Sequence, residues 1–150
     1  SVLVDYAHTP DSLENILLSS RELVGEGGSL VCVFGAGGDR DTSKRSLMGE
    51  AGRLLSDRVI VTSDNPRGES PATIVHEIVA GIQAPNSARV VEDRRAAIAL
   101  ALAEAATHDV VLVAGKGHED YQEIAGVKQP FSDVAEARAG LAKRTTRATA

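Results

Sequence analysis

Short aliphatic runs alternate with longer amphipathic segments along the chain. Runs rich in Val, Leu and Ile predict buried strands at residues 2–4, 30–34, 59–62, 90–91 and 110–114. Apolar positions at helical spacing predict helices at about residues 10–24, 44–55, 71–82, 94–106 and 133–143. Short strands that alternate with helices in this way predict an α/β fold, with a mostly parallel, doubly wound sheet and helices on both faces.

Polar residues at the helix starts support these boundaries. Thr9-Pro10 places an N-cap residue before a proline at the first helical position, and Asp93 is a second N-cap residue. The helix over residues 44–55 is expected to turn one apolar side toward the sheet. That side comprises Leu47, Met48, Ala51, Leu54 and Leu55.

The C-terminal part of the chain is expected to add a small hairpin and a last helix. Two short β-prone segments, Tyr121–Ile124 and Val127–Gln129, flank the turn residues Ala125-Gly126. After the last helix, residues 144–150 lack an apolar pattern and are predicted to form a disordered tail. One folded domain is therefore assigned to residues 1–143.

Composition narrows the class of protein. The chain has 150 residues, of which 43% are hydrophobic and 25% charged, and this fits one globular domain. The net charge is −5 and Lys and Arg form no cluster, so we expect no nucleic-acid partner. The single cysteine, Cys32, lies in an apolar run, and neither a signal peptide nor a membrane-spanning stretch is evident, which favours the cytoplasm. The sequence begins with a strand already under way, as a fragment would.

Polar loops follow the predicted strands at several points. In a parallel doubly wound sheet such loops meet at the carboxyl ends of the strands, where these folds bind their ligands. The loops are Asp5–Thr9, Gly35–Ser43, Ser63–Gly68 and Gly115–Asp120. Their convergence predicts a single binding site at this edge of the sheet.

The loop Gly35–Ser43 is rich in glycine, but it matches neither the G-x-G-x-x-G pattern nor the P-loop pattern. The glycines therefore indicate either a backbone that approaches a ligand closely or a flexible connection. Arg40 lies between Asp39 and Asp41, which could hold its guanidinium in a fixed direction for a planar carboxylate. The alternative is a self-contained surface ion pair.

The segment Asp64-Asn65-Pro66-Arg67 combines turn residues with one acidic and one basic side chain. Proline stiffens the backbone and restricts the residue before it. On such a backbone Asp64 could bind the ammonium group of an α-amino acid and Arg67 its carboxylate. The alternative is an ordinary turn.

The loop Gly115–Asp120 brings an acidic pair next to a lysine and a histidine. Glu119 or Asp120 could accept hydrogen bonds from an ammonium group, whereas Lys116 by itself is expected to be solvated. A metal site made by His118, Glu119 and Asp120 is not favoured, because adjacent residues seldom point at one ion.

The first loop carries two further candidates. Asp5 could accept hydrogen bonds from the hydroxyl groups of a ribose, as acidic residues do in nucleotide sites. His8 could equally be a polar residue at a helix start without a role in binding.

Taken together, these loops resemble the C-terminal domain of the Mur ligases that use diaminopimelate. The matching segments occur in the family's order and are Asp5-Tyr6-Ala7-His8-Thr9-Pro10-Asp11, Phe34-Gly35-Ala36-Gly37-Gly38-Asp39-Arg40-Asp41, Asp64-Asn65-Pro66-Arg67 and Gly115-Lys116-Gly117-His118-Glu119-Asp120-Tyr121-Gln122. Each motif alone is only moderately specific, but their common order makes the resemblance specific. It extends over residues 2–142 and implies a Rossmann-like domain.

The resemblance implies an ATP-dependent ligase of peptidoglycan synthesis. In that family ATP phosphorylates the γ-carboxylate of UDP-N-acetylmuramoyl-L-alanyl-D-glutamate, and an amine of meso-2,6-diaminopimelate attacks the acyl phosphate. Carried over position by position, the amino-acid site comprises Arg40, Asp64, Asn65, Pro66, Arg67, Gly115 and Glu119. Asp5 and His8 match the stretch that faces ATP, and no catalytic residue or metal ligand is assigned.

Departures from the family pattern limit what this chain is expected to do. Ser46 stands where relatives often carry proline, which should affect only a helix start. No part of the sequence matches the UDP-sugar domain or the central ATPase domain, with its P-loop, carbamylated lysine and Mg²⁺ ligands. The resemblance therefore implies a domain that binds the amino acid without catalysing the reaction, while ATP and Mg²⁺ bind mainly to the other domains, which close on this one.

Other functions remain open on the sequence. One is another Mur ligase or a folylpolyglutamate synthetase with a different amino acid, which Arg67 disfavours. A second is a stand-alone module that binds an amino acid or a nucleotide, which a P-loop domain encoded upstream would exclude. A third is a dehydrogenase domain, which the missing G-x-G-x-x-G pattern disfavours.

Overall fold

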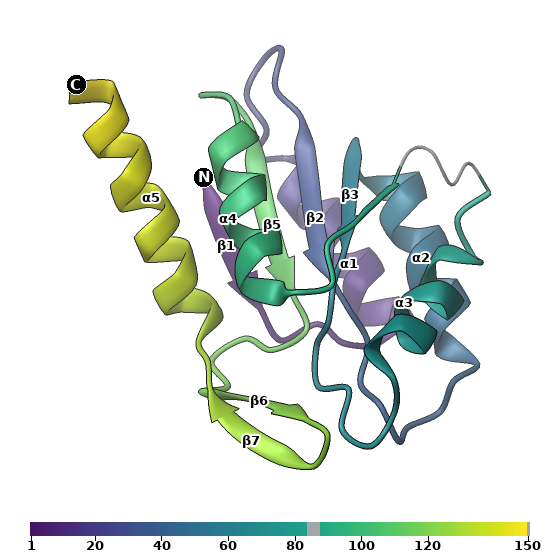
Figure 1. Ribbon diagram of the computed structural model, residues 1–150. Coiled ribbons are helices and arrows are strands. Elements are labelled where there is room, and N and C mark those ends of the chain that lie inside the picture. The colour runs from purple at the N-terminus through teal and green to yellow at the C-terminus, as the bar shows by residue number, and fades with distance from the viewer. Residues whose placement is uncertain (84–87, 150) are drawn as a thin grey trace.

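A parallel sheet forms the centre of the computed structural model, which describes residues 1–83 and 88–149, with side chains up to Arg144. Its strands are β1 (Val2–Asp5), β2 (Leu30–Phe34), β3 (Arg58–Val61), β4 (Ala88–Val90) and β5 (Val110–Ala114). They lie in the order β1-β5-β2-β3-β4, and every pairing is parallel. An antiparallel hairpin follows, made of β6 (Tyr121–Ile124) and β7 (Val127–Pro130). The predicted fold class and hairpin are thus confirmed (Figure 1).

Helices cover both faces of the sheet, as predicted (Figure 1). One face carries α1 (Pro10–Arg21), α2 (Lys44–Leu55) and α3 (Pro71–Val79), and the other carries α4 (Arg94–Glu104) and α5 (Asp133–Thr149). Leu30, Cys32 and Phe34 of β2 belong to the first core, and Val31 and Val33 to the second. Because both faces of the strand are buried, its sequence is a continuous apolar run. None of the described helices is long and apolar enough to cross a membrane.

The predicted helix caps are present. Ser12 N donates to Thr9 Oγ1 at 3.2 Å and Thr9 N donates to Ser12 Oγ at 3.0 Å, which completes a capping box at the start of α1. At the start of α4, Arg95 N donates to Asp93 Oδ1 at 3.1 Å. These bonds satisfy backbone groups that have no partner inside the helix, and so fix where each helix begins.

The predicted inward face of α2 is partly wrong. Met48 is buried, but Leu47 and Leu54 are 51% and 61% exposed. Gly49 is buried instead, and a Cβ added to it would lie 2.1 Å from the backbone oxygen of Ile78. The backbone of α2 therefore approaches the end of α3 more closely than any side chain would allow.

The C-terminal helix is longer than expected. Helix α5 continues to Thr149, so the predicted disordered tail is wrong over residues 144–149, and residue 150 lies outside the described residues. Arg144 Nη1 donates to the backbone oxygens of Leu102 and Ala105, each at 2.6 Å. These carbonyl groups lie at the end of α4, where a helix leaves its last carbonyls without partners. The contact stabilises the end of α4, and it stabilises α5 beyond residue 143, where the apolar pattern of the sequence ends.

Candidate functional site

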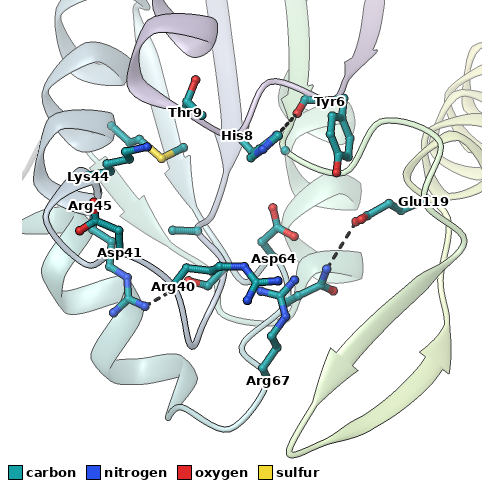
Figure 2. A pocket seen from close by; sticks show the side chains of 15 residues that line it. Tyr6, His8, Thr9, Arg40, Asp41, Lys44, Arg45, Asp64, Arg67 and Glu119 are labelled. Carbon is teal, nitrogen blue, oxygen red and sulfur yellow. Dashed lines mark hydrogen bonds between the residues drawn. The ribbon is translucent and has the colours of Figure 1, made fainter.

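A cavity of about 430 Å³ lies at the carboxyl edge of the sheet, where the loops after β1, β2, β3 and β5 meet (Figure 2). This confirms that the polar loops converge. Most of the predicted amino-acid site lines the cavity, namely Arg40, Asp64, Asn65, Arg67, Gly115 and Glu119. Pro66 does not line it. The lining mixes cationic and acidic side chains, so the cavity suits a ligand that carries charges of both signs.

Two guanidinium groups point into the cavity (Figure 2). Arg40 Nη1 donates a long hydrogen bond of 3.4 Å to the Asp39 carbonyl oxygen, and Arg67 Nη1 donates to the Gly38 carbonyl oxygen at 3.0 Å. Neither arginine forms an ion pair with a carboxylate in the part of the chain that the structure describes. Both therefore keep donors free for an anionic ligand.

The aspartates beside Arg40 bind the backbone rather than its guanidinium. Asp39 Oδ2 accepts from Gly68 N at 3.0 Å. Asp41 Oδ1 accepts from Ser43 Oγ at 2.7 Å and from Ser43 N at 3.0 Å, and these bonds lower the pKa of Asp41. The predicted carboxylate clamp on Arg40 is therefore wrong. The two aspartates shape the loop and leave the guanidinium available.

The glycine-rich loop packs on the Asp64–Arg67 turn. Gly38 N donates to the Asn65 carbonyl oxygen at 2.7 Å, and a Cβ on Gly38 would lie 1.8 Å from the Pro66 carbonyl oxygen. A Cβ on Gly37 would lie 2.8 Å from Arg67 Nη1. The glycines thus admit the neighbouring backbone and the Arg67 side chain. Pro66 takes part through this contact and not by lining the cavity.

Arg67 is held in an unusual backbone conformation. Its φ is 52°, in the left-handed region that costs a non-glycine residue about 1–3 kcal/mol. Its backbone N–H donates to the Glu123 carbonyl oxygen at 2.9 Å, next to an isolated parallel bridge between Arg67 and Ile124. The hairpin therefore fixes the position of this arginine. Strain that the surrounding structure sustains is typical of functional sites.

Lys116 is fully buried, which contradicts the expectation that it is solvated. Its Nζ lies 2.8 Å from Asn65 Oδ1, 3.1 Å from Glu119 Oε1 and 3.7 Å from Asp64 Oδ1. Asn65 Nδ2 in turn lies 3.4 Å from Glu119 Oε1. The acidic side of the cavity is thus held together by Lys116, which does not itself line the cavity.

A buried ion pair fixes the backbone where the loops after β3 and β5 begin. Arg94 donates to both carboxylate oxygens of Asp133 at 2.7 Å, to the Ser63 carbonyl oxygen at 3.0 Å and to the Ala114 carbonyl oxygen at 3.1 Å. Burial alone would lower the pKa of Arg94, but the pairing with Asp133 raises it overall. Ser63 and Ala114 directly precede cavity residues of the loops after β3 and β5. This pair was not predicted, because an arginine at the start of an Ala-rich helix carries no specific signal for a buried ion pair.

Further cations line the cavity besides the predicted ones. Arg45 is buried, and its guanidinium binds Glu69 and Glu77 as well as the Gly37 carbonyl oxygen. Lys44 also lines the cavity, on the side of His8 and Thr9, and forms no ion pair with a described carboxylate (Figure 2). Both follow the glycine-rich loop in sequence, as a Lys-Arg pair that was not predicted to belong to the site.

The residues expected to face ATP occupy different positions. His8 lines the cavity, and its Nδ1 donates to the Tyr6 carbonyl oxygen at 2.8 Å. Asp5 does not line the cavity, and its Oδ1 accepts from Ala7 N at 2.8 Å. A role of either residue in binding ATP stays a prediction. Among the described residues, no group of three or more His, Cys, Asp or Glu side chains is placed to hold one metal ion.

The chain is similar to known ligases in both sequence and structure. Residues 1–117 match the family model "Mur ligase, glutamate ligase domain". A relative from Acidovorax sp. (strain JS42), UDP-N-acetylmuramoyl-L-alanyl-D-glutamate--2,6-diaminopimelate ligase, is 59% identical over 144 residues, covering 95% of this chain and 29% of its own length. A solved structure of a ligase with the same name has a TM-score of 0.90 at 43% identity, over 96% of this chain and 29% of that one. A bifunctional folylpolyglutamate synthase/dihydrofolate synthase from Yersinia pestis has a TM-score of 0.58 at 23% identity, over 76% of this chain and 25% of that one, which shows a shared fold.

Proposed function

The chain belongs to the Mur ligase family, and we propose that it is the amino-acid-binding C-terminal domain of the ligase that joins meso-2,6-diaminopimelate to UDP-N-acetylmuramoyl-L-alanyl-D-glutamate. The chain spans 29% of the length of its relative from Acidovorax. ATP, Mg²⁺ and the UDP-linked precursor would therefore bind mainly to parts of the enzyme outside these residues. A reaction that uses ATP and a UDP-linked precursor belongs to the cytoplasm, where we expect the ligase to act.

The charge pattern of the cavity carries this proposal. Diaminopimelate is lysine with a second carboxylate, so it needs one more cation than lysine does. Arg40 and Arg67 both face the cavity without a carboxylate partner among the described residues, and Asp64 and Glu119 face them (Figure 2). A planar guanidinium is the side chain best suited to bind a carboxylate through two parallel hydrogen bonds. The two arginines would take the carboxylates and the acidic pair would take one ammonium group.

The domain would contribute orientation rather than covalent chemistry. Holding an amine in line with an acyl phosphate can supply a large part of the rate enhancement, because the reacting groups no longer have to find each other. The amine that reacts must stay free of carboxylate partners, which is possible because Asp64 and Glu119 bind the opposite end of the ligand. Lys44 lies on the side of His8 and Thr9 (Figure 2), where it could contact phosphate groups that enter from the rest of the enzyme. Asp5 and His8 remain the residues proposed to face ATP.

The first test is the substitution Arg67→Ala in the full-length ligase. Removing one partner of a desolvated charge pair typically costs about 2–5 kcal/mol, so kcat/KM for diaminopimelate should fall about thirtyfold to several thousandfold. L-Lysine lacks the second carboxylate and should be affected far less. Arg138→Ala, at an exposed position of α5, is the matched control and should leave kcat/KM unchanged for both amino acids. An equal loss for both amino acids would contradict the assignment of Arg67 to the second carboxylate.

A titration of the 150-residue chain tests binding directly. Amide chemical shifts are followed while meso-diaminopimelate or L-lysine is added. Shifts at Arg40, Asn65, Arg67, Gly115 and Glu119 with diaminopimelate alone would support a preformed, selective site. If neither amino acid causes shifts here and the full-length ligase also fails to use diaminopimelate, the proposed function is wrong.

A further inference from the structure

The Gly115-Lys116-Gly117 segment turns its lysine toward the protein interior. Gly115 and Gly117 have φ values of 119° and 56°, which glycine adopts without strain. Both backbone N–H groups donate to the Asp5 carbonyl oxygen, at 3.0 Å and 3.2 Å. A Cβ at Gly115 would lie 2.5 Å from Asp64 Oδ2, so the loop passes directly beside that carboxylate. The turn is thus fixed at both ends, and Lys116 enters the core while Glu119 returns to the cavity.

Among the described residues, the hydrogen bonds and ion pairs of the Lys116 ammonium all go to side chains that line the cavity. Its Nζ donates to Asn65 Oδ1 at 2.8 Å and to Glu119 Oε1 at 3.1 Å, and it lies 3.7 Å from Asp64 Oδ1. Lys116 itself is 0% exposed and is not part of the cavity lining. A lysine is seldom buried so completely, since desolvating its charge is unfavourable unless partners compensate for it. In this protein the compensating partners are three proposed ligand-binding residues.

We propose that Lys116 is a positioning residue for the amino-acid ligand, acting through Asn65 and Glu119 without touching the ligand. This inference rests on the proposed function, because it assigns a role within the same site. Lys116 would act in two ways, by fixing the direction of an amide group and by setting the net charge of the acidic side of the cavity.

Lys116 fixes the direction of the Asn65 side-chain amide. A lysine ammonium only donates hydrogen bonds, so the side-chain oxygen of Asn65 must face Lys116 and cannot face the cavity. The backbone N–H of Glu123 donates to the same oxygen at 3.0 Å, which reinforces this direction. The amide NH₂ group therefore points toward Glu119 and the cavity, where it can donate to a carboxylate of the ligand. Without Lys116 the amide could rotate and present an oxygen that repels that carboxylate.

Lys116 also sets the net charge of the acidic side, which Asp64 and Glu119 form. The two carboxylates carry two formal negative charges, and Lys116 supplies one positive charge beside them, which leaves one net negative charge. One net negative charge matches one ligand ammonium group. Glu119 Oε1 already accepts from Lys116 and Asn65, whereas Oε2 has no hydrogen-bond partner among the described residues. That second oxygen is available to the ligand.

The test compares Lys116→Met with Lys128→Met in the full-length ligase. Lys128 is an exposed lysine of β7 whose Nζ lies 4.6 Å from the centre of the Tyr121 ring, and Lys116 Nζ lies 5.4 Å from the same ring. Both substitutions therefore remove a lysine beside this tyrosine, but only one removes the ammonium from the acidic pair. For Lys116→Met we expect the KM for diaminopimelate to rise about ten- to a hundredfold, the range expected for losing hydrogen bonds to a charged group.

Other kinetic constants separate positioning from a general structural role. The kcat at saturating diaminopimelate and the KM for ATP should stay close to the wild-type values, because the reacting groups are untouched. The preference for diaminopimelate over L-lysine should also persist, since Arg40 and Arg67 are unchanged. Lys128→Met should leave all these constants as they are.

Several results would overturn the inference. One is an unchanged KM for diaminopimelate in Lys116→Met, and another is a loss of kcat with KM unchanged. If Lys116→Met does not fold, Lys116→Gln replaces it. Glutamine can still donate to Asn65 but carries no charge to balance the two carboxylates, so a smaller rise in KM is expected, and an unchanged KM overturns the inference. A wild-type ligase that does not use diaminopimelate would overturn the proposed function itself, and this would be seen before any variant is made.

Discussion

Removing one partner of the buried ion pair between Arg94 and Asp133 should destabilise the protein far more than removing one partner of an exposed pair beside it. Both side chains are 0% exposed, and the guanidinium also donates to the carbonyl oxygens of Ser63 and Ala114. The substitution Arg94→Met keeps much of the side-chain volume but removes every one of these donors. It leaves one buried carboxylate and two buried carbonyl groups without their partner.

The expected magnitudes follow from burial. Removing one partner of a buried ion pair typically costs about 3–5 kcal/mol, because the other charge stays buried and unpaired. The next residue offers a matched comparison, since Arg95 Nε donates to Glu136 Oε1 at 2.9 Å and links the same two helices, α4 and α5. The Arg95 and Glu136 side chains are 64% and 21% exposed, and exposed ion pairs contribute only about 0–1 kcal/mol. Arg95→Met should therefore be almost neutral.

Urea unfolding and thermal unfolding of the wild type and both variants measure the difference in stability. Arg94→Met should lower the free energy of unfolding by about 3–5 kcal/mol and the melting temperature by about 6–20 °C. The double variant Arg94→Met/Asp133→Leu should regain part of this loss, because it leaves no unpaired charge. A difference of less than about 1 kcal/mol between Arg94→Met and Arg95→Met would refute the reasoning.

Three further predictions concern other parts of the fold. Burial alone would raise the pKa of Asp109, but backbone N–H donors and Arg58 lower it overall. A lowered pKa in the folded state stabilises the protein above the unfolded-state pKa of about 4 and ceases to do so as the pH falls through the folded value. Asp109→Asn should thus lower the free energy of unfolding by about 1–3 kcal/mol at neutral pH and by less in acid. Urea unfolding at several pH values measures this, and a loss that does not depend on pH would contradict the prediction. Gly49→Ala should lower stability by about 1–3 kcal/mol in thermal unfolding, although alanine favours helices, because its Cβ would lie 2.1 Å from the Ile78 backbone oxygen; a gain in stability would refute the close contact. Burial raises the pKa of the Cys32 thiol to about 12, so a thiol reagent should label it only once urea unfolds the chain, and rapid labelling of the native protein would argue against its burial.

Much of the fold could be predicted because the sheet is buried on both faces. Strands such as β2 and β5 appear in the sequence as uninterrupted apolar runs, which are typical of a parallel sheet that is covered on both faces. The inward face of α2 could not be predicted in the same way. Hydrophobicity pointed to its leucines, whereas the close approach of α2 to α3 depends on Gly49, which carries no hydrophobic signal.

The place of the candidate site was predictable from topology, but its internal pairing was not. Asp39 and Asp41 are the nearest acidic residues to Arg40 in sequence, yet both bind backbone groups instead. Lys116 is separated from its partner Asn65 by 51 residues. Arg94 likewise lies 39 residues from Asp133. Contacts over such distances along the chain arise only when the strands are assembled, so charge patterns in single loops do not reveal them.

The pairing of charges, more than their number, indicates what the cavity can bind. Arg45, which lines the cavity, and Lys116, which lies behind its lining, are both buried, and each has carboxylate partners from within the chain. Their positive charges are therefore already balanced, whereas those of Arg40 and Arg67 are not balanced by any described carboxylate. A ligand with a single carboxylate would leave one of these guanidinium groups without a counter-charge. An unpaired charge in a concave site costs free energy, and the cost grows as water is excluded from the site. A ligand with two carboxylates and one ammonium group, placed between the arginines and the acidic pair, balances the charges of these four side chains and of Lys116. The proposed selectivity for a diamino dicarboxylic acid rests on this balance.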